Sequence, residues 1–372
     1  MDWALLLEWF LKSLVLIFGL LGGFAYTTYY ERRWIARLQV RVGPNRVGPL
    51  GLLQPIADAA KLIFKEELTP AKVYKTVFFL SPLLTMVPSL VIAAVIPLGT
   101  SFTLGGRTIH MYLANINVGA LYLMSVASIA VYGIVLAGWS SNNKYAMLGG
   151  LRSTAQMISY ELTLGLMFVA AILLGNSMSM VDIVEGQRDM WFGAIQPVGF
   201  VLFFIATLAE VNRSPFDMPE AEQELTAGYH TEYSGMKFAL FFMAEYQKMI
   251  VVSMIGATLF LGGYRELWFL KDTFLSVDRA WFLGPFYLVA KVFLLLGLMI
   301  WIRAAWPRIR YDRLMSLGWK VLVPLSLAVI FLTAAGILIE SSWFILISSL
   351  LAAAVAVAFI QRALRRKAYE FA

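Results

Sequence analysis

The stretch between residues 210 and 232 is dense in carboxylates. Six acidic residues lie within these 23 positions against one cation, Arg213; they are Glu210, Asp217, Glu220, Glu222, Glu224 and Glu232. Like charges this close cannot all ionise cheaply, so some of their pKa values should rise toward neutrality. Carboxyl groups that titrate near the working pH can hold and pass protons. The segment therefore predicts proton transfer. An ordinary solvated acidic loop is the alternative, but interleaved apolar residues such as Phe216 and Leu225 favour a half-buried cavity wall.

Four more ionisable residues fall inside long apolar runs: Glu161, Glu245, Lys248 and Lys291. Such groups are costly in hydrocarbon and usually face a bundle interior or a water path. We measured their depths from the helix ends on the side of the acidic loop, at 1.5 Å per residue. The two glutamates lie roughly 10–12 Å deep and the two lysines roughly 17–18 Å deep. We expect a graded path from the acidic loop toward the bilayer centre. Simple neutralisation of Glu245 by Lys248, at i,i+3, is the competing interpretation.

Cysteine and histidine usage excludes several redox roles. The chain has no cysteine and two histidines, His110 and His230. Thiolates for iron–sulfur clusters or structural zinc are therefore missing, as are the paired histidines of a di-haem cytochrome. We expect no metal site, so electrons would arrive on a partner or a diffusible carrier. His110 is predicted to be surface. His230 adjoins the acidic cluster and could titrate near neutral pH, or serve only as a structural histidine.

The composition predicts an integral membrane protein. Of the 372 residues, 60% are hydrophobic and 14% charged, whereas soluble domains carry about 25% charged residues. Runs of about 20 apolar residues span a bilayer as helices. We predict an all-α polytopic bundle, one transmembrane domain over residues 1–372, with about nine helices. The expected spans are 10–30, 78–98, 118–138, 155–175, 196–211, 237–262, 285–303, 320–340 and 343–360, the fifth being short and the last two forming a hairpin at Ser341 and Ser342.

Charge asymmetry predicts the orientation. With the loop after the first span placed in the cytoplasm, 22 Lys and Arg residues lie on that side and six on the other. This asymmetry indicates an outside N-terminus and a cytoplasmic C-terminus in the cell's inner (plasma) membrane. It also explains the net charge of +7 without a nucleic-acid partner. The first apolar run lacks the features of a cleaved signal peptide, so we expect it to be retained.

The first cytoplasmic loop combines a basic stripe, a stiff turn and an amphipathic segment. Arg33, Arg37 and Arg41 recur every four residues, and Gly43–Pro49 contains two Gly and two Pro. Leu52–Glu67 then alternates with helical spacing and is too short and too charged to span, which predicts a helix at the membrane surface. The loop is either a positive anchor or a docking platform and portal for an amphipathic ligand.

Several blocks resemble one known family. They are Glu31-Arg32-Arg33, Val42 to Pro49, Gly51 to Asp58, Lys65-Glu66, Gly138 to Tyr145, Ser159 to Leu162, and Arg213-Ser214-Pro215-Phe216-Asp217 through Gly228 to Tyr233. Together they are similar to the H subunits (mitochondrial subunit 1) of respiratory complex I, the proton-translocating NADH:quinone oxidoreductase. The blocks run from the first span to the seventh, while the last two helices match in hydropathy alone.

The resemblance implies a place beside the peripheral-arm subunits, where the chain would form the membrane wall of a quinone chamber. Arg33, Arg37, Arg41, Asp58 and Lys61 would line or support the side by which quinone enters, with His230 assigned to the same chamber. Glu161, Glu210, Glu220, Glu222, Glu224, Glu232 and Glu245 would carry protons toward small and antiporter-like membrane subunits, with Lys248 and Lys291 continuing the path. NADH, flavin and iron–sulfur clusters would belong to partner subunits. Some relatives place a carboxylate where this chain has Ser128, so the route through that helix could differ.

Three other interpretations compete with this one. The homologous membrane subunit of a membrane-bound hydrogenase would share the fold but need no quinone site. A free-standing ion transporter often shows two-fold repeats with broken helices, and we find no such pairing. A scaffold without a path would leave the graded acids unexplained.

Overall fold

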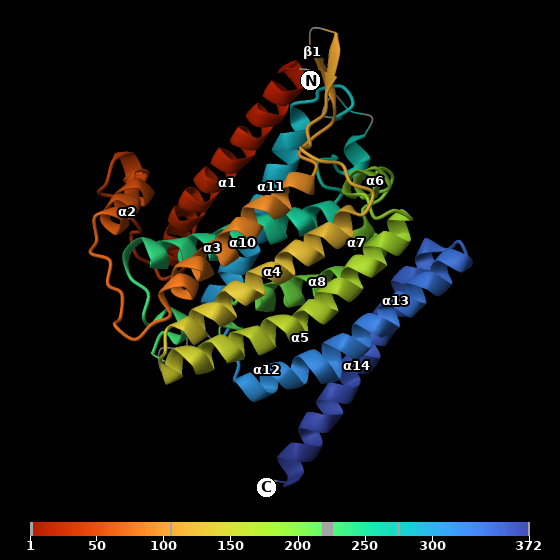
Figure 1. Cartoon of the computed structure of the whole chain (residues 1–372). Helices are drawn as coiled ribbons and strands as arrows, with labels where there is room; N and C mark the ends of the chain where they lie inside the picture. The colour runs from red at the N-terminus through yellow and green to blue at the C-terminus, as the bar shows by residue number, and fades with distance from the viewer. Residues whose placement is uncertain (1–2, 105, 218–225, 272, 274–275, 371–372) are drawn as a thin grey trace.

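The structure is a helical bundle (Figure 1). The computed structural model describes residues 3–104, 106–217, 226–271, 273 and 276–370. Among these residues, eight helices are long and apolar enough to cross a membrane, and a ninth apolar helix is shorter. The long spans are α1 (Trp3–Leu38), α3 (Lys75–Val91), α4 (Gly119–Ser140), α5 (Lys144–Gly175), α10 (Gly235–Phe260), α11 (Leu283–Ala305), α12–α13 (Tyr311–Leu317 and Val323–Leu338) and α14 (Ser342–Glu370). The polytopic all-α class is thus confirmed.

The predicted short fifth span is α8, Pro197–Glu210. Its 14 residues cover about 21 Å, less than a hydrocarbon core of about 30 Å. The short helices α6 (Met180–Glu185) and α7 (Phe192–Ile195) precede it. Pro197 occupies the first turn of α8, where its missing N–H costs no hydrogen bond. Glu210 is the last residue of α8, and its placement inside the bundle follows from that early end.

Helix α10 is at the centre of the bundle. Every residue from Met249 to Phe260 is buried, and α1, α3, α8 and α11 all contact it. Because a helix that is apolar on all sides must be surrounded, this stretch forms the dry core. The preceding turns of the same helix carry Glu245 and Lys248. One end of α10 is therefore polar and the other sealed by packing.

Two of the long spans have irregular ends. α3 contains Pro82 and Pro88 and tightens into the 3₁₀ turn Ile92–Val95; each proline removes a helical N–H. A π turn, Gly318–Leu322, joins α12 to α13. The predicted hairpin between the last two helices is present, since α13 ends at Leu338 and α14 begins at Ser342 across Glu340, whose φ is 54°.

The first loop carries α2, Gln54–Ile63, after the 3₁₀ turn Pro49–Gly51. It is shorter than the predicted Leu52–Glu67 and contains no buried residue. Figure 1 shows it at the side of the molecule, where it contacts α1 and α10. Helix α1 continues to Leu38, so Arg33 and Arg37 lie on it and Arg41 follows its end.

The opposite end of the bundle carries a small hairpin that sequence reasoning missed. Strand β1 (Phe102–Leu104) pairs antiparallel with β2 (Arg107–Ile109) near the N-terminus of α1 (Figure 1). Phe102 stacks on Trp281 with ring centroids 4.5 Å apart, which ties the hairpin to the loop before α11. The turns Gly228–His230 and Trp268–Leu270 complete the described elements. The end of the bundle that carries this hairpin is called the hairpin end. The opposite end, where α1 leads into the loop that carries α2, is called the loop end.

Candidate functional site

A buried amide fixes the loop that follows α8. Gln156 on α5 donates from Nε2 to Ala209 O at 2.9 Å, Asn212 Oδ1 at 3.2 Å and Phe216 O at 2.8 Å. Asn212 adopts a φ of 53°, a left-handed conformation that asparagine tolerates. These contacts tie the last turn of α8 and the loop after it to α5. The positions of Glu210 and Arg213, on either side of Asn212, are set by this contact.

Glu210 and Lys248 form an ion pair inside the bundle. Lys248 Nζ lies 2.6 Å from Glu210 Oε1, and Glu210 is 4% exposed. The second carboxylate oxygen of Glu210, Oε2, is buried with no hydrogen-bond partner among the described residues. Buried polar atoms of this kind usually have a partner, often an ordered water. The carboxylate is therefore bonded on one side and open on the other.

Glu161 lies on α5 facing α4. Ser128 donates its hydroxyl to Glu161 Oε1 and also lies 3.0 Å from Met124 O. The neighbouring Tyr160 fixes the rotation of α5, because its buried hydroxyl donates to Leu314 O at 3.0 Å and Gly318 packs against its ring. Ser128, the residue at which the sequence left the route through this helix open, thus places its hydroxyl in direct contact with Glu161.

Two small cavities connect these groups. The first is lined by Glu245, Glu210 and Lys248 among others, and the second by Glu161, Glu210 and Lys248. Each has a volume of about 40 Å³, which is enough for at least one water molecule. They share the residues Ser89, Ile92, Ala127, Glu210 and Lys248. The predicted residues Glu161, Glu210, Glu245 and Lys248 therefore border one interrupted internal space.

A cluster of alternating charges continues this space toward the loop end. Arg213 Nε lies 2.8 Å from Glu245 Oε1, Nη1 lies 3.6 Å from Glu31 Oε1, and the guanidinium lies over the Tyr246 ring at 4.3 Å. On its other side Glu31 accepts a hydrogen bond from Arg303. Burial alone would lower the pKa of Arg213, but Glu245, Tyr246 and Glu31 outweigh it and hold the pKa above its usual value. The guanidinium stays charged.

The structure describes part of the acidic loop. Glu220, Glu222 and Glu224 lie outside the described residues. Asp217 accepts from Arg308 Nη2 at 2.9 Å, and Glu232 accepts from Asn143 Nδ2 at 2.7 Å. These two acids flank the internal space without lining either cavity.

His230 lies in an aromatic pocket. Its ring centroid is 3.8 Å from that of Tyr229, 5.3 Å from Phe241 and 5.6 Å from Phe238. Burial lowers the pKa of His230 to about 3, because a charged imidazole is disfavoured away from water. Of the two expectations for His230, this environment favours a structural histidine over a group that titrates near neutral pH. Its neighbour Tyr229 lines the first cavity.

Lys291 lies apart from the other path candidates. Its ammonium donates to Gly263 O at 2.8 Å and Arg265 O at 2.5 Å, and lies 4.4 Å from the Trp191 ring centroid. Both carbonyls follow the end of α10, at the hairpin end. The buried run Met249–Phe260 separates Lys291 from Lys248. The structure therefore does not bring Lys291 to the other residues of the predicted graded path. Its ammonium instead binds the loop between α10 and α11.

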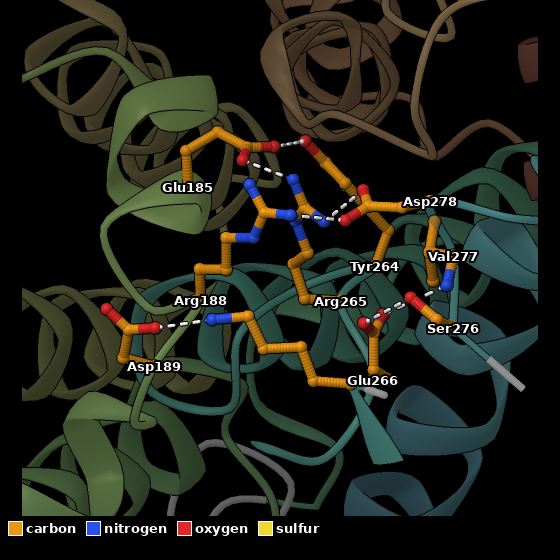
Figure 2. A network of polar contacts seen from close by, with 10 residues as sticks. Glu185, Arg188, Asp189, Tyr264, Arg265, Glu266, Ser276, Val277 and Asp278 are labelled. Atoms are coloured by element: carbon orange, nitrogen blue, oxygen red, sulfur yellow. Dashed lines mark hydrogen bonds and ion pairs between the residues drawn. The ribbon is translucent and has the colours of Figure 1, made fainter. Parts of the chain in front are cut away.

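That loop carries its own ion network (Figure 2). Arg265, 6% exposed, bonds to Glu185 and lies 2.7 Å from Asp278, while Arg188 lies 2.5 Å from Asp278. Burial would raise the pKa of Asp278, but its bonds with Arg265 and Arg188 lower it. Glu266 is buried and accepts from Ser276 Oγ at 3.0 Å and Val277 N at 3.2 Å. The network joins the loop after α10 to α6 and to the segment before α11 at the hairpin end.

The residues predicted to face quinone are near the end of α1. Arg32 Nη1 lies 2.5 Å from Asp58 Oδ2, which joins α1 to α2, and Arg33 donates to the Tyr29 hydroxyl at 2.7 Å. Arg37, Arg41 and Lys61 are exposed. The structure ties Asp58 to α1 through Arg32, places Arg33 beside Tyr29 on the same helix, and leaves the other three residues on the surface. Within the described part of the chain, no group of three or more metal-ligating side chains converges.

Sequence reasoning missed Glu31, Arg303 and Gln156 as site residues. Glu31 and Arg303 lie in the last turns of α1 and α11, where charges are ordinary membrane anchors. Gln156 carries no charge at all. Only a tertiary contact reveals these roles; the one signal in the sequence is an acid, Glu31, among basic residues at a helix end.

Comparisons with known proteins agree with one another. The family model described as NADH dehydrogenase matches residues 11–334. The second NADH-quinone oxidoreductase H subunit of Geobacter metallireducens is 50% identical over 335 residues, covering 87% of this chain and 93% of that protein. The H subunit of Thermomicrobium roseum is 49% identical, covering 90% and 97%, and the first H subunit of Geobacter sulfurreducens is 48% identical, covering 89% and 95%. The chain is therefore a multi-pass membrane protein that belongs to the NADH dehydrogenase family, among the NADH-quinone oxidoreductase H subunits.

Proposed function

We propose that this chain forms the membrane wall of a quinone chamber and the first part of a proton path coupled to quinone reduction. The observation that carries this proposal is the line of charged side chains through the bundle. It runs from Arg303 through Glu31, Arg213 and Glu245 to Lys248, Glu210 and Glu161. Charged groups are expensive at such depth, and a structural scaffold would not need seven of them in series.

Charge coupling supplies the mechanism. Quinone reduction next to Glu31 and Arg213 would change the charge on the loop side of the cluster. Because Arg213 holds Glu245, that change alters the proton affinity of Glu245 at the first cavity. Protons then pass by carboxylates and water to Glu210 and Glu161, toward small and antiporter-like membrane subunits. Arg213 itself only transmits charge, since a guanidinium does not give up its proton.

The quinone assignment rests on the end of α1 and its flank. An apolar cavity of about 500 Å³ lies between α1, α10 and α11, with Tyr26, Thr27 and Tyr30 at one end. Such a space suits an isoprenoid tail arriving from the bilayer. The quinone ring would enter beside α2, in a region surrounded by Arg33, Arg37, Arg41, Asp58 and Lys61. His230 would support the chamber wall through Tyr229 rather than by titrating.

The partners follow from the exposed surface. The loop end carries exposed apolar side chains around α2, including Val40 at 96% and Phe64 at 89% exposure. These residues would be covered by peripheral-arm subunits, which would hold the flavin and iron–sulfur clusters that bring electrons from NADH; this chain has no cysteine to bind such clusters. The loop end would then face the cytoplasm, with the N-terminus outside, in a single membrane domain.

The test uses the whole complex purified by a tag on this chain and reconstituted in vesicles. Glu245→Gln should preserve NADH-driven dye reduction, which needs only the peripheral arm, and lose most quinone reduction and proton uptake. Glu340→Gln, an exposed acid in the α13–α14 turn, is the matched control and should behave like the parent. Full pumping by Glu245→Gln would refute the proposed path.

A further inference from the structure

The wall between the two cavities contains a neutral hydroxyl, Ser89. It lies near the end of α3, directly after Pro88, and is 3% exposed. Of the five residues that line both cavities, the polar ones are Ser89, Glu210 and Lys248. Glu245 borders only the first cavity and Glu161 only the second. Ser89 therefore borders both cavities, between the one that Glu245 lines and the one that Glu161 lines.

The hydrogen bonds of Ser89 suit a hydroxyl that turns. Its Oγ lies 2.6 Å from Met86 O and 2.9 Å from Gln247 Oε1. A hydroxyl has one proton and can donate to only one of these acceptors at a time, which leaves its lone pairs able to accept. Rotation between two acceptors costs no hydrogen bond. Ser253 on α10 lacks this choice: its only oxygen acceptor among the described residues is Met249 O at 2.8 Å, with a sulfur of Met299 at 4.0 Å.

The cavities offer the partners that a relay requires. Each has room for water, and the free oxygen of Glu210, Oε2, is a buried acceptor in their common wall. A polar site of this size holds water when two or more polar groups face it. Glu210 and Lys248 border the same two cavities, and their charges are held together in an ion pair. Ser89 is the neutral hydroxyl among these three residues and can pass a proton without breaking the ion pair.

We propose that Ser89 is the proton-relay residue between the two cavities, an inference that rests on the proposed function. Oγ takes a proton from protonated water in the first cavity while its own proton passes to water in the second. One O–H bond forms on Oγ as the other breaks, so Ser89 is neutral before and after. The hydroxyl then turns so that its new proton again points toward the second cavity, which restores the starting state; its bonds to Met86 O and Gln247 Oε1 are the resting positions between transfers.

The experiment uses the complete complex in vesicles, with Ser89→Ala, Ser89→Thr, Ser253→Ala and Glu210→Gln variants. Ser89→Ala should slow proton uptake and coupled quinone reduction roughly tenfold, less than the 10²–10⁴-fold typical of a lost acid or base because water substitutes in part. NADH-driven dye reduction should be unchanged. The solvent deuterium isotope effect on quinone reduction should rise, because proton transfer becomes rate-limiting; a packing defect would not raise it. Ser89→Thr should restore the parent rate.

Three results would overturn the relay: parental pumping by Ser89→Ala, a Ser89→Thr variant as slow as Ser89→Ala, or an equal loss in Ser253→Ala. Should Ser89→Ala fail to assemble, Ser89→Cys keeps the volume with a weak donor and is expected to show the same loss. The Glu210→Gln variant separates this inference from the broader proposal. If it loses pumping while Ser89→Ala keeps it, only the relay is wrong; if it pumps fully, the path and the relay both fail.

Discussion

Lys248 Nζ lies 2.6 Å from Glu210 Oε1, a contact between the middle of α10 and the final residue of α8. It depends on α8 ending early, inside the bundle, under the bonds from Gln156. The two residues belong to both cavities and so join Glu245 on one side to Glu161 on the other. A substitution at either residue of this ion pair therefore alters both cavities at once.

Removing the Lys248 ammonium should destabilise the protein, because Glu210 would remain buried without its partner. Lys248→Met leaves Glu210 buried without its partner, and breaking a buried pair costs about 3–5 kcal/mol unless the acid takes up a proton. We expect lower thermal stability of the purified complex and loss of proton uptake in vesicles. The double variant Glu210→Gln/Lys248→Met, with both charges gone, should recover stability but not pumping. A single variant that pumps at the parental rate would contradict the assignment of Lys248.

The Arg32–Asp58 contact should control access of quinone more than stability. Both side chains are partly exposed, so the pair contributes at most about 1 kcal/mol. Asp58→Asn loosens α2 from α1, and we expect KM for quinone to rise roughly two- to fivefold with kcat unchanged. Asp312→Asn, which removes the exposed carboxylate paired with Arg310 at 2.9 Å, serves as the control. An unchanged KM would remove α2 from the access route.

His230 should make the folded protein sensitive to acid. Its pKa falls from the ordinary 6.5 to about 3 on burial, so below pH 6.5 the unfolded state binds more protons than the folded one. The stability that depends on a neutral ring is complete above pH 6.5 and decreases as the pH falls toward 3. From pH 7.5 to 5.5 the loss is about 1.4 kcal/mol.

Thermal denaturation of the complex at those two pH values checks this. His230→Gln, which does not titrate, should show a smaller difference between pH 7.5 and 5.5 than the parent. An equal difference in parent and variant would mean that His230 is not the group responsible.

The ion network at the hairpin end should be structural. Arg265→Met removes the cation shared by Glu185 and Asp278. A fully buried pair would cost about 3–5 kcal/mol, but both acids are partly exposed, so we expect about 2 kcal/mol. Denaturation temperature should fall, while the ratio of protons pumped to NADH oxidised stays at the parental value. A changed ratio with normal stability would place this network in the pumping route.

Hydropathy and charge were enough to predict the spans, the short fifth helix and the final hairpin, because each depends on local composition. The lengths of α1 and α5 were underestimated, since their extra turns at the loop end are polar and carry no hydropathy signal. The β1–β2 hairpin was missed because three-residue strands give no period to detect.

Only some of the site residues could be predicted, because the others are defined by tertiary contacts. Counting turns placed Glu161, Glu245 and Lys248 at depths where the structure does bring them to a common space. The same counting placed Lys291 with them, but depth does not say which neighbour a side chain meets, and the loop after α10 folds back to meet Lys291. Arg213, Glu31 and Arg303 lie far apart in the sequence, on or beside three different helices, so their cluster could not be seen before folding.

The most direct test of the path is the number of protons translocated per NADH oxidised by reconstituted complex carrying Glu210→Gln. The change removes the charge shared by the two cavities and keeps the shape of the side chain. The account predicts normal NADH-driven dye reduction with proton translocation reduced to background. Translocation at the parental ratio would contradict the claim that protons cross this chain by way of the two cavities that Glu210 and Lys248 border.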